Sequence, residues 1–129
     1  MNTILWILQA LLAILYLLHG WLYVAQPARM EEQMRQRRPD LQPPSISPGF
    51  RRFIGVAEWL AAAGLILPGR TGILPWLTPL AAAGMMIVTS NATGYHLGRR
   101  ETQSAIFTAV LFVLLTFVAY LRWPVAPLS

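Results

Sequence analysis

Four long apolar stretches alternate with short polar segments along this chain. The first, residues 2–25, contains no Asp, Glu, Lys or Arg, and about 20 such residues suffice for a helix to cross the hydrocarbon core of a membrane. Further apolar stretches follow at about residues 51–67, 73–93 and 104–123, separated by polar segments at residues 26–50 and 94–103. The pattern predicts an all-α fold, an integral membrane four-helix bundle with antiparallel neighbours.

Prolines and glycines indicate where these helices begin and end. Residues 28–38 favour a short helix at the membrane surface, which Pro39 ends because it cannot continue the hydrogen-bond pattern. Residues 68–72 predict a tight turn that makes the second and third spans antiparallel neighbours. Pro75 and Pro79 fall in the first turns of the third span, where proline is best tolerated. The first stretch lacks a basic start and a cleavage motif, so we expect a retained span rather than a secretory signal.

One five-residue sequence occurs twice. Leu-Ala-Ala-Ala-Gly stands at residues 60–64 and again at residues 80–84. Small residues in the middle of a span let two helix backbones approach closely in lipid. We interpret the two copies as a packing seam between the second and third spans.

Composition strengthens the membrane interpretation. Of the 129 residues, 56% are hydrophobic and 12% are charged, whereas roughly 25% are charged in an ordinary soluble domain. We expect residues 1–129 to form a single transmembrane domain without a soluble part. The chain has no cysteine, which excludes disulfides, thiolate metal sites and CxxC redox pairs, so that a redox role requires a bound cofactor.

The distribution of charge predicts the orientation. The net charge is +5 and all ten basic residues are arginines. Arg70 and Arg122 lie at one end of the predicted bundle, and the other eight lie at the opposite end: Arg29, Arg35, Arg37, Arg38, Arg51, Arg52, Arg99 and Arg100. Because cytoplasmic loops collect positive charge, we expect residues 26–50 and 94–103 in the cytoplasm and both termini outside, in a bacterial inner membrane.

The eight arginines are interpreted as topology determinants, and contact with anionic lipid headgroups is the alternative. They lie between apolar blocks rather than on a face studded with aromatic residues. We therefore do not expect nucleic acid as a partner.

Polar side chains are predicted to share one layer inside the bundle. Glu58 is the only acidic residue within a span, and a charge that faces lipid costs at least about 2.5 to 3.5 kcal/mol. Each of the other three spans brings polar side chains to a similar depth. We expect one buried cluster below the cytoplasmic face: Tyr16, His19, Glu58, Asn91 and Thr108.

Two uses of this cluster are consistent with the sequence. In the first, Glu58 is protonated and the hydrogen bonds only hold helices together, at about 0.6 to 2 kcal/mol each. In the second, Glu58 and His19 are candidate catalytic residues that exchange a proton for a quinone head group or a proton-coupled step. We expect His96 to be solvated at the mouth of the third span, and two distant histidines with one buried acid do not predict a metal site.

Four short motifs mark the ends and centres of the spans. They are Leu18-His19-Gly20, the stretch Phe-Ile-Gly-Val-Ala-Glu-Trp-Leu at residues 53–60, Gly-Leu-Ile-Leu-Pro at residues 64–68, and Tyr95-His96-Leu97 after an Ala/Gly/Met-rich third span. Together they resemble the DoxX-like family of small four-helix membrane proteins. The resemblance implies a family linked in some members to quinone-coupled sulfur oxidation, and in others to redox-stress complexes or membrane-protein assembly. Glu58 matches the acid of the family's second helix, whereas residues 21–23 (Trp-Leu-Tyr) depart from relatives that often carry a lysine there.

We therefore expect a subunit or accessory factor of a larger membrane complex, with a redox complex as one candidate. Its partners are membrane lipids and either another protein or a second copy of the chain. The alternative is a quinone-binding or proton-handling subunit of a membrane oxidoreductase that uses Glu58 and His19, and whether the chain is itself an enzyme stays open. A small transporter is a third hypothesis, which requires an oligomer because four short helices leave little room for a substrate path.

Overall fold

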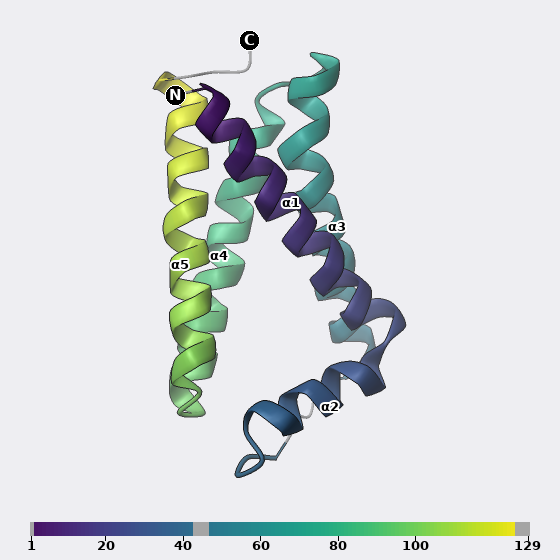
Figure 1. Cartoon of the computed structure of the whole chain (residues 1–129). Coiled ribbons are helices and arrows are strands. Elements are labelled where there is room, and N and C mark those ends of the chain that lie inside the picture. The colour runs from purple at the N-terminus through teal and green to yellow at the C-terminus, as the bar shows by residue number, and fades with distance from the viewer. Residues whose placement is uncertain (1, 43–46, 126–129) are drawn as a thin grey trace.

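The computed structural model describes residues 2–42 and 47–125, which are almost entirely helical (Figure 1). The helices are α1 (Asn2–Ala25), α2 (Pro27–Arg37), α3 (Pro48–Thr71), α4 (Leu77–Gly98), α5 (Thr102–Tyr120) and the short π-helix η1 (Leu121–Val125). No strand occurs in these two ranges. The predicted all-α fold is confirmed, and the short helix expected over residues 28–38 is present as α2.

α3 extends beyond the apolar stretch at residues 51–67 because both of its ends are capped. The Ser47 hydroxyl accepts a hydrogen bond from the backbone N–H of Phe50 (3.2 Å), which satisfies one of the unpaired donors at the N-terminus of α3. At the other end Gly72 has a φ of 72°, the left-handed conformation that commonly ends a helix. α4 is displaced from the predicted residues 73–93, because the chain first turns through Leu74 and Pro75.

Pro68 lies inside α3 without breaking it. A proline has no N–H, so the carbonyl of Gly64, four residues earlier, loses its usual helical donor. The hydroxyl of Thr78 in α4 donates to this carbonyl instead (2.8 Å). The missing bond of α3 is thereby replaced by a contact that joins α3 to α4.

The long helices pack as two pairs (Figure 1). α1 crosses α3, α4 lies along α5, and the pairs meet mainly through α3 and α4. Successive long helices run in opposite directions, and α2 lies across one end (Figure 1). Side chains from all four long helices form the core, among them Leu12, Tyr16, Leu65, Ala82, Met85, Leu115 and Val118.

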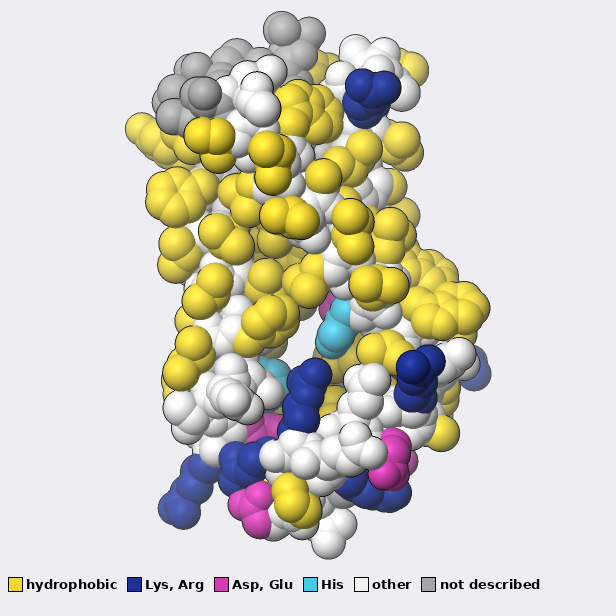
Figure 2. All heavy atoms as spheres, viewed as in Figure 1, with side chains coloured by type: hydrophobic (Ala, Val, Ile, Leu, Met, Phe, Trp, Pro, Cys, Tyr) yellow, Lys and Arg dark blue, Asp and Glu magenta, His cyan; other side chains and the backbone are white. Residues whose placement is uncertain are grey.

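Most of the apolar surface faces outward, and Figure 2 shows hydrophobic side chains over the greater part of one face, with charged side chains gathered at the α2 end. Among the described residues, two helical segments are long and apolar enough to cross a membrane, Asn2–Ala25 and Thr102–Trp123. Only 33% and 22% of their apolar windows are buried within the protein, so their apolar side chains do not mainly serve an internal core. Length and surface together suggest a membrane protein.

Candidate functional site

A histidine and a glutamate from different helices form a close pair. Nδ1 of His19 in α1 lies 2.7 Å from Oε2 and 2.9 Å from Oε1 of Glu58 in α3. Glu58 is buried, with 5% of its surface exposed, whereas the His19 side chain is 46% exposed. The Glu58 carboxyl is therefore enclosed by protein, whereas the His19 imidazole that contacts it is partly exposed at the protein surface.

Two glycines allow α1 and α3 to approach closely enough for this contact. A Cβ added to Gly20 would lie 2.8 Å from the carbonyl oxygen of Gly55, and one added to Gly55 would lie 2.5 Å from the Val24 side chain. Real Cβ atoms are essentially never so close to other atoms. Because Gly20 follows His19 directly and Gly55 lies one turn before Glu58, the same close crossing positions the pair.

Aromatic side chains surround the pair on α1 and α3. The ring of Tyr23 packs against the His19 ring, with 4.4 Å between the centroids. Tyr16, one turn from His19 on the other side, is buried, and its hydroxyl has no hydrogen-bond partner among the described residues. The indole N–H of Trp59 donates to the carbonyl of Leu17 (3.2 Å), a further contact across the α1–α3 interface.

The structure brings only part of the predicted polar cluster together. Asn91 is exposed, and its side-chain amide donates to the carbonyl of Ile87 in its own helix (3.0 Å). The Thr108 hydroxyl lies 2.7 Å from the Thr93 hydroxyl, within the α4–α5 pair. The expectation that Asn91 and Thr108 join Glu58 is therefore corrected: α4 and α5 satisfy these groups between themselves.

The two helix pairs separate towards the α2 end. Figure 2 shows a hollow at this level, bordered by histidine side chains and, deeper, by an acidic side chain. The His19 side chain is 46% exposed, and α1 packs mainly on α3 and only weakly on α5. The site is a buried carboxyl reached through a half-exposed imidazole.

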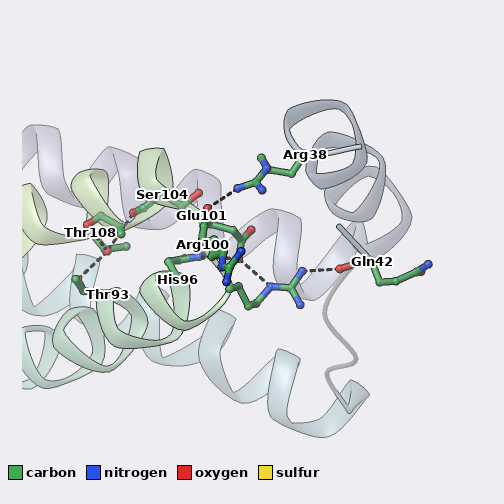
Figure 3. A network of polar contacts seen from close by, with 10 residues as sticks. Arg38, Gln42, Thr93, His96, Arg100, Glu101, Ser104 and Thr108 are labelled. Carbon is green, nitrogen blue, oxygen red and sulfur yellow. Dashed lines mark hydrogen bonds and ion pairs between the residues drawn. The ribbon is translucent and has the colours of Figure 1, made fainter. Parts of the chain in front are cut away.

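A second polar network, not predicted from the sequence, ties the α4–α5 turn to the segment after α2 (Figure 3). Glu101 accepts a hydrogen bond from Nε of Arg99 (2.9 Å) and lies 3.3 Å from Nδ1 of His96. Arg99 also donates to the carbonyl of Gln42 (2.5 Å), and Arg38 donates to the carbonyl of Arg100 (2.6 Å). His96 is thus paired with an acid rather than simply solvated, and the only hint in the sequence was the proximity of Glu101.

The arginines of the predicted cytoplasmic loops differ in their contacts. Arg51 donates to the carbonyl of Tyr23, which ties the start of α3 to the end of α1. Arg35 lies near two acids of its own helix, Glu31 and Glu32. Arg29 donates only weakly to Gln26 (3.4 Å). The side chains of Arg37, Arg52 and Arg100 are exposed.

Arg122, at the end of the fourth apolar stretch, is turned into the protein. It is 2% exposed and donates from Nε to the Gln9 side chain (2.6 Å) and from a terminal nitrogen to Asn2 (2.5 Å). Its guanidinium carbon lies 5.3 Å from the Trp6 ring centroid. Gln9 in turn donates to the carbonyl of Leu65 (2.5 Å), so one network joins α1, α3 and η1.

Within residues 2–42 and 47–125, no three His, Cys, Asp or Glu side chains lie close enough together to hold a metal ion.

A search of curated proteins and a search of solved structures gave no match to the chain. A sequence profile of the DoxX-like family matches residues 7–118. This range includes both members of the His19–Glu58 pair and most of the α4–α5 network. Since the match covers far more than half of the sequence and includes the helices described above, the chain belongs to the DoxX-like family.

Proposed function

We propose that this chain is an integral membrane protein whose His19–Glu58 pair binds a quinone head group and exchanges a proton with it. The observation that carries the proposal is the contact between a buried carboxyl and a half-exposed imidazole, inside helices whose outer surface is apolar. A buried ionisable pair among membrane-type helices is most often functional.

The membrane part of the proposal has α1, α3, α4 and α5 spanning the bilayer as an antiparallel four-helix bundle. At about 1.5 Å per residue these helices are roughly 28 to 36 Å long, close to the thickness of a hydrocarbon core of about 30 Å. Large apolar side chains point outward from all of them, such as Ile7, Leu60, Ile87 and Phe117. The arginine-rich α2 end lies in the cytoplasm of a bacterium and both termini lie outside.

The chemistry follows from the two nitrogens of one imidazole. Nδ1 of His19 is engaged by Glu58, which orients the ring and leaves Nε2 for a ligand. Nε2 of a neutral His19 accepts a proton from the hydroxyl of a reduced quinone, and the Glu58 carboxylate stabilises the resulting imidazolium. The reverse transfer returns the proton to an oxidised quinone as it receives electrons from a partner protein.

Quinone binding to the purified protein tests this proposal. We expect decylubiquinone, added to the protein in lipid nanodiscs, to quench tryptophan fluorescence with a saturable dependence on concentration. His19→Gln and Glu58→Gln should each weaken binding by roughly tenfold or more, because the first removes the imidazole that meets the head group and the second removes the carboxylate that orients it. Glu31→Gln on the exposed face of α2 is the matched control and should bind like the unmodified protein.

Unchanged decylubiquinone binding in both His19→Gln and Glu58→Gln would contradict a quinone site at this pair. Mass spectrometry of an organic extract supplies an independent measurement. A native quinone should co-purify with the unmodified protein and be depleted from Glu58→Gln.

A second candidate function, an accessory subunit of a membrane complex, is favoured by a groove on the outer surface. The groove has a volume of about 360 Å³ and lies between α3 and α4, where it is lined by apolar side chains that include Leu60, Leu67, Leu77 and Leu80. Its lining also includes the small residues Ala63, Gly64 and Ala81, and small residues let another helix approach closely. Replacing Ala63 by Leu should fill the groove and remove any protein that co-purifies in mild detergent, while decylubiquinone binding is retained.

A further inference from the structure

Both histidines of this chain are paired with a glutamate. His19 contacts Glu58 between α1 and α3, and His96 lies 3.3 Å from Glu101 at the α4–α5 turn. The side chains of His96 and Glu101 are 22% and 14% exposed, so this second pair is close to the surface without being free in solution. The chain has two histidines in total, and both belong to the half of the molecule that faces α2.

A tyrosine ring packs against each histidine. Tyr23 packs on the ring of His19, with 4.4 Å between the centroids, and it interacts electrostatically with Glu58, Tyr95 and Glu101. The Tyr95 ring in turn contacts the ring of His96, with 5.6 Å between centroids. Tyr23 therefore lies within electrostatic range of both carboxyls, Glu58 and Glu101.

The surface pair is held in place by charged side chains of the turn. Arg99 donates to Glu101 (2.9 Å) and to the carbonyl of Gln42 (2.5 Å). The backbone carbonyl of Arg100 accepts from Arg38 (2.6 Å), which itself is paired with Asp40 (Figure 3). These contacts fix Glu101 beside His96 and attach the segment after α2 beneath the hollow, so the pair has a defined position at the mouth of the site.

We propose that His96 and Glu101 form the mouth of a proton pathway that leads past Tyr23 to the His19–Glu58 pair. The inference rests on the proposed function, since the pathway supplies the proton that His19 exchanges with its ligand. Protonated His96 releases a proton to the hydroxyl of Tyr23 or to water in the hollow, which passes one on to Nε2 of His19. His96 then takes up a proton from the cytoplasmic water, and no electron moves in these steps.

The rate at which His19 gains and loses its proton tests the pathway. In nanodiscs, protein labelled with ¹³C and ¹⁵N in histidine gives two sets of imidazole signals, which His19→Gln and His96→Gln assign. Exchange between the protonated and neutral forms of His19 is measured from the NMR line shapes. We expect His96→Gln, Glu101→Gln and Tyr23→Phe each to slow this exchange by roughly tenfold or more, the scale of a lost proton-transfer group.

Tyr120→Phe is the matched control for Tyr23→Phe, because Tyr120 is an exposed tyrosine at the opposite end of the molecule. It should leave the exchange rate unchanged. Circular dichroism of every variant checks that the helices are retained, and the three pathway variants alter side chains conservatively.

Two measurements separate the pathway from the function on which it rests. If His96→Gln and Tyr23→Phe exchange protons at His19 as fast as the unmodified protein, the pathway is overturned, even where decylubiquinone binding still depends on Glu58. If His96→Gln slows exchange while it binds decylubiquinone with unchanged affinity, the pathway is supported. If Glu58→Gln binds decylubiquinone as tightly as the unmodified protein, the proposed function is overturned instead.

Discussion

Glu58 and Arg122, two charged side chains that the structure buries almost completely, are each held by a polar side chain from another helix. Glu58 contacts His19, and Arg122 donates to Gln9 and Asn2. A buried charge without such partners is strongly unfavourable, because it loses its hydration and gains nothing in return. At the residue scale, each of these side chains therefore joins two helices.

Replacing Gln9 by Leu should destabilise the protein. The substitution removes the acceptor of Arg122 Nε and the donor to the Leu65 carbonyl, and a hydrogen bond to a charged group contributes about 1.5 to 3 kcal/mol. Thermal unfolding in detergent, followed by circular dichroism, measures the loss. Gln103→Leu on the exposed face of α5 is the control, and an equal effect of both variants would show that the buried network contributes nothing specific.

Asp40 should remain ionised to unusually low pH. The hydrogen bonds from Arg38 lower the pKa of the Asp40 carboxyl from 3.8 to about 2. Because the pKa is lower in the folded protein, the pair stabilises the fold above pH 3.8, and this contribution is lost as the pH falls towards 2. Asp40 is the only aspartate of the chain, so a ¹³C-aspartate label follows it alone, and Arg38→Gln should return its titration midpoint to near 3.8.

At the scale of helices, the closest approach is the crossing of α1 and α3 at Gly20 and Gly55. The Leu-Ala-Ala-Ala-Gly repeat predicts a similar seam between α3 and α4, and the glycines of its two copies differ in their surroundings. A Cβ on Gly64 would lie 2.8 Å from the Cβ of Ala81, whereas one on Gly84 would meet no atom within 4 Å. Gly64 of the first copy therefore packs tightly on Ala81 of the second, whereas Gly84 does not take part in the seam. The His19–Glu58 contact lies at the other crossing, between α1 and α3.

Gly55→Ala should weaken the α1–α3 crossing. Its Cβ would lie 2.5 Å from Val24 and 3.0 Å from the carbonyl oxygen of Gly20, and overpacking of this kind costs about 1 to 3 kcal/mol. Thermal unfolding and decylubiquinone binding should both be impaired, because the crossing also positions Glu58. The matched control, Gly84→Ala in open space, should be neutral or stabilising by up to about 1 kcal/mol, because alanine favours helix.

The whole molecule has two unlike ends. One carries α2, the α4–α5 turn and eight of the ten arginines, and the other carries the start of α1, the α3–α4 turn and the end of α5. The intervening surface is largely apolar (Figure 2). Such an arrangement suits a bilayer whose cytoplasmic side faces the arginines.

Single cysteines test this orientation, because the chain has none of its own. Gln36→Cys lies in α2 and Thr71→Cys lies at the end of α3, both on exposed positions. In intact bacterial cells, a membrane-impermeant maleimide should label Thr71→Cys and should label Gln36→Cys only after the membrane is opened. The opposite pattern of labelling would place the arginine-rich end outside the cell.

The sequence by itself determined the helical fold, the approximate limits of the helices and the family, because the apolar periodicity and the prolines act locally on the backbone. It also brought His19 and Glu58 to attention, since ionisable residues within apolar stretches are rare. The tertiary structure alone decided which polar groups meet. Asn91 and Thr108 found acceptors within α4 and α5, Arg122 turned inward to Gln9, and the glycines of α1 and α3 selected the His19–Glu58 contact. These contacts depend on how the helices cross and on how each helix is rotated about its axis. Close packing between segments far apart in the sequence sets both, and the apolar periodicity of a single segment does not specify them.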